Sequence, residues 1–149
     1  MDWIRIDNRL VHGQIIETWL PHTNAGAIIV ANGPVSADAI QQQIMCLAIP
    51  QSVRVYFTTP EEAARIFASV EHSAIVLFED CTDAMTAWEH GLHCETLNIG
   101  NIHYETGRRQ LSPSVALSPG DEKLLRQFER SGVRLDFRCV PNDPVQVKF

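Results

Sequence analysis

The sequence predicts an α/β domain with a mostly parallel central sheet, helices on both faces, and one antiparallel hairpin edge in the C-terminal third. Short apolar runs alternate with segments of helical period along the whole chain, and this alternation changes only after Gly100. The 149 residues, 45% of them hydrophobic, match the size and composition of one globular domain. We therefore expect residues 1–149 to fold as a single domain.

Four strands are expected in the first half of the chain, because four short apolar runs are each followed by turn or helix signals. Continuous apolar runs of this kind suit a parallel sheet that is covered on both faces. The expected strands are Trp3–Ile6, Ala27–Val30, Val53–Phe57 and Ile75–Phe78.

Helices are expected to connect these strands. Apolar positions with helical spacing predict a first helix over residues 13–20, which Pro21 would end. Ser36 is expected to cap a second helix that carries one apolar stripe. A stripe at this spacing usually faces the core, so we expect burial of its three members, Ile40, Ile44 and Leu47.

Later helices carry their own start signals. Thr59, followed by Pro60 and then by Glu62, predicts a capping box. Thr82 and Ser118 are the expected N-caps of two further helices.

The C-terminal third combines strands with a hairpin. Leu97–Ile99 and Val133–Val140 are expected strands, and a hairpin is expected around Thr106–Gly107. Gly91 and Gly132 are expected to end the helices that precede the two strands.

Composition excludes several classes of protein. The net charge of −6 argues against a nucleic-acid partner, although residues 108–138 are locally basic. No run is apolar enough to span a bilayer, and no signal peptide is visible at the N-terminus, so a cytoplasmic location is expected. The four cysteines lack metal-ligand spacing, so we expect reduced, mostly buried thiols and no metal site.

One loop concentrates residues suited to phosphoryl chemistry. It follows the first expected strand and contains Asp7, Arg9, His12, Gly13 and Gln14. The imidazole of His12 offers a nucleophilic nitrogen, and the Arg9 guanidinium can neutralise phosphate oxygens. The helix that begins near Gly13 offers free backbone N–H groups, and Asp7 can orient a charged neighbour. A solvated surface loop is the alternative reading of the same residues.

Other chemistry-bearing residues are weaker candidates. His103 follows another expected strand end and is a candidate for the same site, with an exposed hairpin residue as the alternative. Glu79 and Asp80 end a strand and could bind Mg²⁺, but no further residue favours it. The remaining histidines are expected to be surface residues: His22, His72, His90 and His93.

The segment IRIDNRLVHGQI, residues 4–15, closely resembles the opening R-[IV]-D-[DE]-R-[LI]-[IV]-H-G-Q-V motif of a bacterial family. That family is the IIB component of the mannose/fructose/sorbose class of the phosphoenolpyruvate:sugar phosphotransferase system. The segment LNIGNIHYETGRRQ, residues 97–110, resembles the family's N-[VI]-G-G-M…G-K-x-Q segment, and similarity extends through residues 116–143.

The resemblance implies an α/β phosphocarrier that takes a phosphoryl group from the IIA component. It would pass the group to a sugar that the membrane components IIC and IID import, which would place the protein in the cytoplasm or at the inner face of the membrane. His12 falls on the phosphorylated position and Arg9 on a phosphoryl-contacting one, while Asp7, Gly13 and Gln14 complete the motif. The resemblance implies no cofactor, and it is compatible with a homodimer.

Three departures from the family pattern accompany the resemblance. Asn8 replaces the second motif acid, Asn101 replaces the second glycine of the later loop, and the chain ends at Phe149, soon after the last expected strand.

Three alternatives remain beside transport. A IIB-like phospho-acceptor with a regulatory role would differ only after phosphorylation. A ligand-binding α/β module without chemistry is favoured only by Asn8 and Asn101. A histidine phosphatase is disfavoured because Val11 precedes His12 where that class has arginine.

Overall fold

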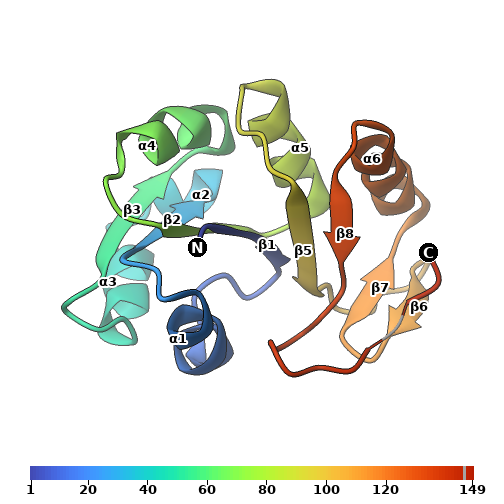
Figure 1. The fold of residues 1–149 in the computed structure, drawn as a ribbon, viewed down its shortest axis with the longest axis horizontal. Coiled ribbons are helices and arrows are strands. Elements are labelled where there is room, and N and C mark those ends of the chain that lie inside the picture. The colour runs from blue at the N-terminus through green and yellow to red at the C-terminus, as the bar shows by residue number, and fades with distance from the viewer. Residues whose placement is uncertain (146) are drawn as a thin grey trace.

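The computed structural model describes residues 1–145 and 147–149, and these residues form one six-stranded parallel sheet with a small separate hairpin (Figure 1). The strand order is β3-β2-β4-β1-β5-β8, and each neighbouring pair is parallel. The predicted α/β class is therefore confirmed. The strands of the sheet are β1 (Trp3–Asp7), β2 (Ala27–Ala31), β3 (Arg54–Thr58), β4 (Ala74–Phe78), β5 (Thr96–Asn101) and β8 (Arg134–Asp136).

Helices cover both faces of the sheet, as predicted. In Figure 1, α1 and α3 lie on one side of the sheet, and α4, α5 and α6 lie on the other. The helical segments are η1 (Ile15–Trp19), α1 (Leu20–Thr23), α2 (Gly33–Ser36), α3 (Ala39–Leu47), η2 (Pro60–Glu62), α4 (Ala63–Ser69), α5 (Cys81–Glu89) and α6 (Pro119–Arg130).

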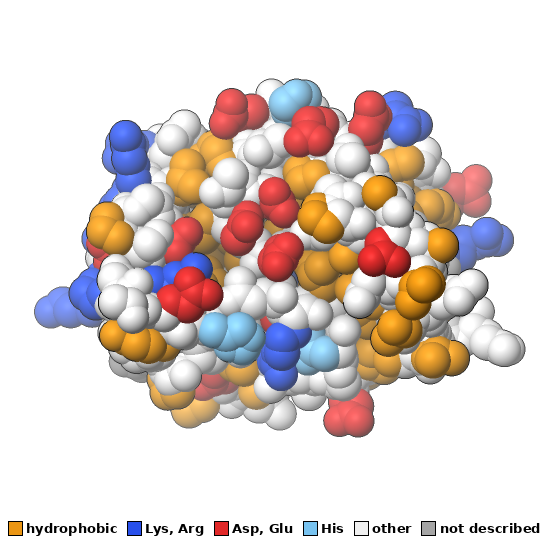
Figure 2. Space-filling view, turned by 180° about the vertical axis from the view of Figure 1, so that it is seen from behind, with side chains coloured by type: hydrophobic (Ala, Val, Ile, Leu, Met, Phe, Trp, Pro, Cys, Tyr) orange, Lys and Arg blue, Asp and Glu red, His pale blue; other side chains and the backbone are white. Residues whose placement is uncertain are grey.

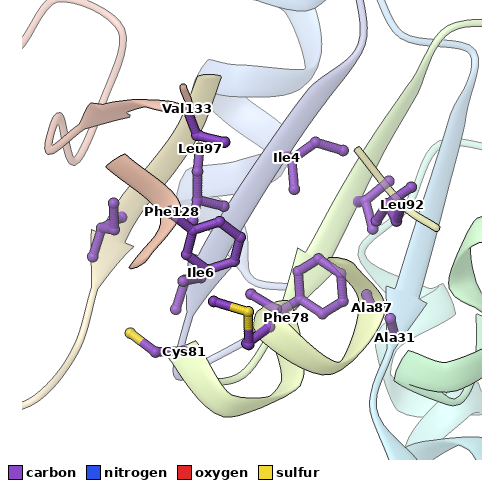
Figure 3. Packing of buried hydrophobic residues seen from close by; sticks show 14 of the residues in the cluster. Ile4, Ile6, Ala31, Phe78, Cys81, Ala87, Leu92, Leu97, Phe128 and Val133 are labelled. Atoms are coloured by element: carbon purple, nitrogen blue, oxygen red, sulfur yellow. The ribbon is translucent and has the colours of Figure 1, made fainter. Parts of the chain in front are cut away.

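The sheet separates two hydrophobic clusters because successive side chains of a strand point to opposite faces. Ile4 and Ile6 of β1 pack with Phe128 of α6, as Figure 3 shows. On the other face, Trp3 stacks on Trp19 of η1 with their ring centroids 4.7 Å apart. All five residues of β1 are buried, so this strand occupies the centre of the molecule.

The first helical segment differs from its prediction, because Pro21 does not end it. Helical backbone begins at Gly13, passes through the π-helical η1, and ends at Thr23 with Asn24 in the left-handed conformation. The Leu20 N–H bonds to the Ile15 carbonyl, five residues back. This wider turn relieves the clash that a proline ring makes in a regular α-helix.

Two predicted N-caps and one predicted capping box are wrong. Asp38 rather than Ser36 caps α3, and Asp80 rather than Thr82 caps α5. The Thr59 side chain makes no capping bond, because Pro60 begins a 3₁₀ turn there. Asp38 and Asp80 have the extended backbone of a cap, and their side chains accept free N–H groups of the helices. Thr59 occupies the N-cap position of η2 as predicted, but no side chain caps that turn. The remaining signals are confirmed: Ser118 forms a capping box with Asp121, and Gly91 and Gly132 follow helix ends with positive φ.

The predicted burial of the α3 stripe is wrong. Ile40, Ile44 and Leu47 are 70%, 54% and 87% exposed. All nine residues of α3 are described, and none of them is buried. The hydrophobic residue by which α3 packs against the buried cluster is Met45, so the helix turns the Ile40, Ile44 and Leu47 stripe to solvent.

The hairpin and the last strand of the C-terminal third also differ from their predicted bounds. The hairpin pairs β6 (Arg109–Ser112) with β7 (Val115–Leu117), so its turn follows Ser112, whereas Thr106–Gly107 forms an earlier turn. The last strand covers only Arg134–Asp136 of the predicted residues 133–140. The segment beyond it leaves the sheet to pack against Trp19, whose indole N–H bonds to the Cys139 carbonyl.

The expectation of mostly buried cysteines is also wrong. Cys81 is buried, Cys94 and Cys139 are half-buried, and Cys46 is exposed. All four are free thiols in the described chain.

The two isoleucine environments predict different stability effects. Ile29 of β2 is completely buried, so Ile29→Ala is expected to cost about 2–5 kcal/mol of unfolding free energy. Ile44→Ala removes an exposed side chain and is expected to cost less than about 1 kcal/mol. Urea unfolding of both variants measures the difference, and equal losses would contradict the exposed position of α3.

Candidate functional site

The loop after β1 lies at a switch point of the sheet. From β1 the chain moves to β2 on one side, and it later crosses from β4 to β5 on the other side of β1. The carboxyl ends of β1 and β5 meet there, and the Asn8 N–H bonds to the Asn101 carbonyl at 3.0 Å. Open parallel sheets bind ligands at such positions.

The Asp7 carboxylate organises this loop. Its Oδ1 accepts the Arg9 backbone N–H at 2.9 Å, and the Asp7 carbonyl accepts the Leu10 N–H at 3.0 Å. Leu10 has φ of +55° and is buried in the core below, so packing holds a left-handed conformation that costs roughly 1–2 kcal/mol. The loop is therefore fixed between a buried carboxylate and a buried leucine.

His12 and Asp7 form the central pair of the site. His12 Nε2 lies 2.9 Å from Asp7 Oδ2, and the Asp7 side chain is completely buried. Burial alone raises the pKa of Asp7, but the His12 hydrogen bond, the Arg5 charge and the Arg9 N–H outweigh it and lower that pKa to about 2. Ionised Asp7 only accepts hydrogen bonds, so His12 Nε2 carries the proton of this bond.

A second group of polar side chains surrounds the pair. Gln14 Oε1 accepts Arg9 Nη2 at 3.0 Å and Asn101 Nδ2 at 3.3 Å, and Cys139 Sγ lies 3.3 Å from the same oxygen. Asn101 Nδ2 also lies 3.1 Å from Asp7 Oδ2. Arg9 is 41% exposed, with its Nε 3.7 Å from Asp7 Oδ1, so the guanidinium reaches solvent above the buried pair.

Asn8 connects the loops on either side. Its Nδ2 donates to the Glu79 carbonyl at 2.7 Å, and its Oδ1 accepts the His103 N–H at 2.7 Å. A carboxylate at this position could accept but could not donate. Asn8 therefore ties the ends of β4 and β5 to the His12 loop in a way that an acidic residue would not.

Gly13 opens the space in front of the helix. A Cβ at this position would meet no atom within 4 Å, so internal packing does not require glycine here. The missing side chain leaves room beside His12, where helical backbone begins. Backbone N–H groups at such a helix start attract anions.

All five predicted site residues therefore lie together: Asp7, Arg9, His12, Gly13 and Gln14. His103 contacts the site through its backbone, while its side chain is exposed. Glu79 Oε2 accepts Asn32 Nδ2, and Asp80 caps α5. Within residues 1–145 and 147–149, no cluster of three or more His, Cys, Asp or Glu residues is arranged to hold a metal.

The remaining histidines have local partners elsewhere. His22 packs edge-on against Trp19, and His93 lies against the ring of Trp88. His90 Nδ1 bonds to the Thr86 carbonyl, and the His72 side chain lies against Gly26.

Three residues of the site were not predicted: Arg5, Asn101 and Cys139. Arg5 is two residues before Asp7 on β1, and strand alternation could have placed both on one face. Asn101 was noted only as a departure from the family. Cys139 approaches the site through a turn of the C-terminal segment that no local pattern indicates.

Acidic side chains gather beside histidine and Lys or Arg side chains on the face shown in Figure 2. Burial, together with repulsion by Asp80, Glu79 and Glu61, raises the pKa of Asp83 to about 6. These four carboxylates cluster around the end of β4 and repel one another.

A neutral imidazole, oriented by a buried carboxylate and flanked by arginine and a helix start, can accept a phosphoryl group. Fold and site together define an α/β domain suited to phosphoryl chemistry. The family model "PTS system sorbose subfamily IIB component" matches residues 1–147. The chain belongs to this family, the sorbose-subfamily IIB components of the sugar phosphotransferase system.

Characterised relatives agree with this assignment. The chain is 33% identical to the sorbose-specific EIIB component of Klebsiella pneumoniae, over 94% of this chain and 87% of the relative. It is 30% identical to the N-acetylgalactosamine-specific IIB component 2 of Escherichia coli, over 94% and 90%. The chain is thus a phosphoryl-transfer carrier of a sugar phosphotransferase system, a family that works with IIA and membrane IIC and IID components, and the regulatory alternative is not favoured.

Solved structures share the fold. The sorbose permease IIB domain from Klebsiella pneumoniae has a TM-score of 0.87 at 32% identity and covers 97% of this chain and 91% of its own. The N-acetylgalactosamine-specific IIB component 1 from Escherichia coli has a TM-score of 0.90 at 28% identity, with coverage of 99% and 97%. In the part of the chain that the structure describes, no helix is long and apolar enough to cross a membrane.

The lowered pKa of Asp7 predicts a specific acid sensitivity. The folded pKa of about 2 lies below the ordinary 3.8, so the ionised pair stabilises the fold above pH 4 and loses that effect as pH falls to 2. The loss should be about 2 kcal/mol. Asp7→Asn should cost about 3–5 kcal/mol at pH 7, because it leaves Arg5 buried without its carboxylate.

Urea unfolding of the native protein and Asp7→Asn between pH 2 and pH 7 measures this effect. The gap between the two proteins should narrow below pH 4. Parallel pH dependences would show that Asp7 is not the stabilising carboxylate.

Proposed function

We propose that His12 is the residue that carries the phosphoryl group, taking it from a phosphohistidine of the IIA component. It then passes the group to a sugar imported by the membrane components IIC and IID. The observation that carries this proposal is the 2.9 Å contact between His12 Nε2 and the buried, ionised Asp7. A buried carboxylate that orients one imidazole nitrogen leaves the other available as a nucleophile.

The same contact favours one of the two ring nitrogens as the nucleophile. Nε2 holds the proton that it donates to Asp7, so the lone pair of the neutral ring lies on Nδ1. Within residues 1–145 and 147–149, Nδ1 of His12 has no hydrogen-bond partner. We therefore expect the phosphoryl group on Nδ1.

The transfer step requires no proton movement at the nucleophile. The Nδ1 lone pair of His12 forms the new N–P bond while the N–P bond of the donor histidine breaks and its electron pair returns to the donor ring. The His12 ring becomes more positive during this step, and Asp7 stabilises that charge through the Nε2 proton. In the second half-reaction a sugar hydroxyl oxygen attacks phosphorus and releases its proton to water, while the N–P bond of His12 breaks and its electron pair returns to Nδ1.

Arg9 is the residue suited to the phosphoryl oxygens. Its guanidinium is partly exposed and hydrogen-bonds a neutral amide oxygen of Gln14 rather than a carboxylate. Its contact with Asp7 Oδ1 is a longer one of 3.7 Å, so it can move to the incoming anion without breaking a hydrogen-bonded ion pair. The Gly13 backbone at the helix start adds a second region of positive potential.

The relatives indicate the substrate class. Their names specify sorbose, fructose and N-acetylgalactosamine, which are all hexoses or hexose derivatives. We infer that the acceptor for this chain is also a hexose or hexose derivative. The carrier would meet it at the inner face of the membrane, held there by IIC and IID.

Intact-mass analysis tests the acceptor residue. The protein is incubated with phosphoenolpyruvate, Enzyme I, HPr and a cognate IIA, and one acid-labile phosphoryl group is expected. His12→Ala should gain none, whereas His90→Ala, which alters an exposed histidine at the end of α5, should be phosphorylated normally. Phosphorylated His12→Ala would overturn the assignment. NMR of the phosphorylated ring distinguishes Nδ1 from Nε2.

The role of Arg9 predicts a rate effect. Arg9→Ala should slow phosphoryl transfer from IIA to this protein about tenfold or more, as the loss of one charge-stabilising donor commonly does. Arg65→Ala removes an exposed arginine of α4 that pairs with Glu62, and it serves as the matched control. Single-turnover kinetics measures both rates, and equal rates would remove Arg9 from the site.

A further inference from the structure

A second guanidinium lies beneath the site and never reaches solvent. Arg5 is completely buried, a rare state for arginine. Its Nη2 and Nε donate to Asp7 Oδ2 at 2.9 and 3.2 Å, on the oxygen that also faces His12 Nε2. Trp3, Arg5 and Asp7 alternate along β1 and so share one face of the sheet.

The neighbouring strand is shaped around this guanidinium. A Cβ on Gly100 of β5 would lie 2.0 Å from Arg5 Cζ, so the guanidinium lies directly against the glycine backbone. Asn98, also on β5, accepts Arg5 Nη1 at 2.8 Å. The Trp19 ring covers it with Cζ 5.6 Å from the ring centroid. These neighbours fix the position of Arg5 and exclude water from it.

The charges around Asp7 explain what Arg5 does. Three groups that carry or gain positive charge face this carboxylate: Arg5 from β1, and Arg9 and His12 from the loop. The contact from β5 is the neutral amide of Asn101. Arg138 of the C-terminal segment pairs with Asp136 instead, and its backbone carbonyl faces Arg5 at 3.4 Å. The buried Arg5 thus offsets the charge of Asp7 permanently.

We propose that Arg5 is a positioning residue for phosphoryl transfer: it neutralises Asp7 from below, so that Asp7 orients a neutral His12 ring and Arg9 stays free for the phosphoryl group. This inference rests on the proposed role of His12. Gly100 is required for the same arrangement, because a side chain at this position would occupy the space that the Arg5 guanidinium fills.

Removing Arg5 changes the site in a definable way. An uncompensated Asp7 would favour protonation of His12, because a nearby opposite charge favours the charged form of a group. A protonated imidazole has no lone pair with which to attack. The same carboxylate would also draw Arg9 into a closer ion pair. Phosphoryl acceptance would then require a higher pH.

The test measures the rate of phosphoryl transfer from phosphorylated IIA as a function of pH. Arg5→Met should be slowed about tenfold at pH 7, and the acidic limb of its pH–rate profile should move up by about one unit. Arg5→Lys keeps the charge and should keep the native acidic limb. Arg138→Met is the matched control, since Arg138 also lies over Trp19 but pairs with Asp136.

A double-mutant cycle shows whether Arg5 acts through Asp7. In an Asp7→Asn background, Arg5→Met should produce no further shift of the acidic limb. The double variant also removes both buried charges together, so it should be more stable than Arg5→Met alone. Gly100→Ala, which displaces the guanidinium without changing any charge, should reproduce the shift.

The outcomes separate this inference from the function on which it rests. A native protein that is not phosphorylated on His12 would overturn the proposed function. Normal phosphorylation with an unshifted acidic limb in folded Arg5→Met would overturn the role of Arg5 alone. Thermal unfolding at each pH gives the folded fraction, and each rate is divided by that fraction, so that a pH-dependent loss of folded protein is not read as a shift of the limb. Should Arg5→Met fail to fold, a shifted acidic limb in Arg5→Lys would overturn the proposal.

Discussion

The buried ion pair between Arg5 and Asp7 joins the fold of this protein to its chemistry. A carboxylate without access to water is stable as an anion only when positive charge and hydrogen-bond donors surround it, and Asp7 receives both from β1, β5 and the following loop. The oxygen that Arg5 holds is the one that orients His12. The same contacts therefore stabilise the centre of the sheet and orient the imidazole that we propose as the phosphoryl acceptor.

The position of this pair follows from the sheet topology. β1 lies between β4 and β5, and the chain crosses over β1 on its way from β4 to β5. The carboxyl ends of β1 and β5 therefore meet beside His12, although these strands are far apart in the sequence. Asn8 fastens the loop to the β4 and β5 ends, and Leu10 anchors it in the core. A loop held in this way loses little conformational entropy when a ligand binds, which suits the proposed phosphoryl acceptor. Arg9 and Gly13 are the exposed residues of the loop, so an incoming group can reach both.

Local patterns along the chain predicted the strands well because each buried parallel strand is a distinct apolar run, as in Ala27–Ala31. The local patterns failed where two neighbouring residues could both serve as the N-cap of a helix. Asp38 and Asp80 lie close to the predicted caps Ser36 and Thr82 and have equally suitable side chains, and only the path of the chain selects between them. The stripe of α3 has a core-like period, yet the helix packs against the core through Met45 and leaves the stripe exposed.

For the site, the sequence by itself determined the loop that we propose for the chemistry. All five of its candidate residues lie within eight consecutive positions of one motif: Asp7, Arg9, His12, Gly13 and Gln14. Their types and spacing already specify a nucleophile, a countercharge and a helix start. Only the tertiary structure decided how they are held. Asn101 and Cys139 reach the loop from residues about 90 and 125 positions away, and the guanidinium of Arg5 depends on the bare backbone of Gly100 on the next strand. Charge compensation of a buried group is a property of its neighbours in space, and the pairing of β1 with β5 sets those neighbours.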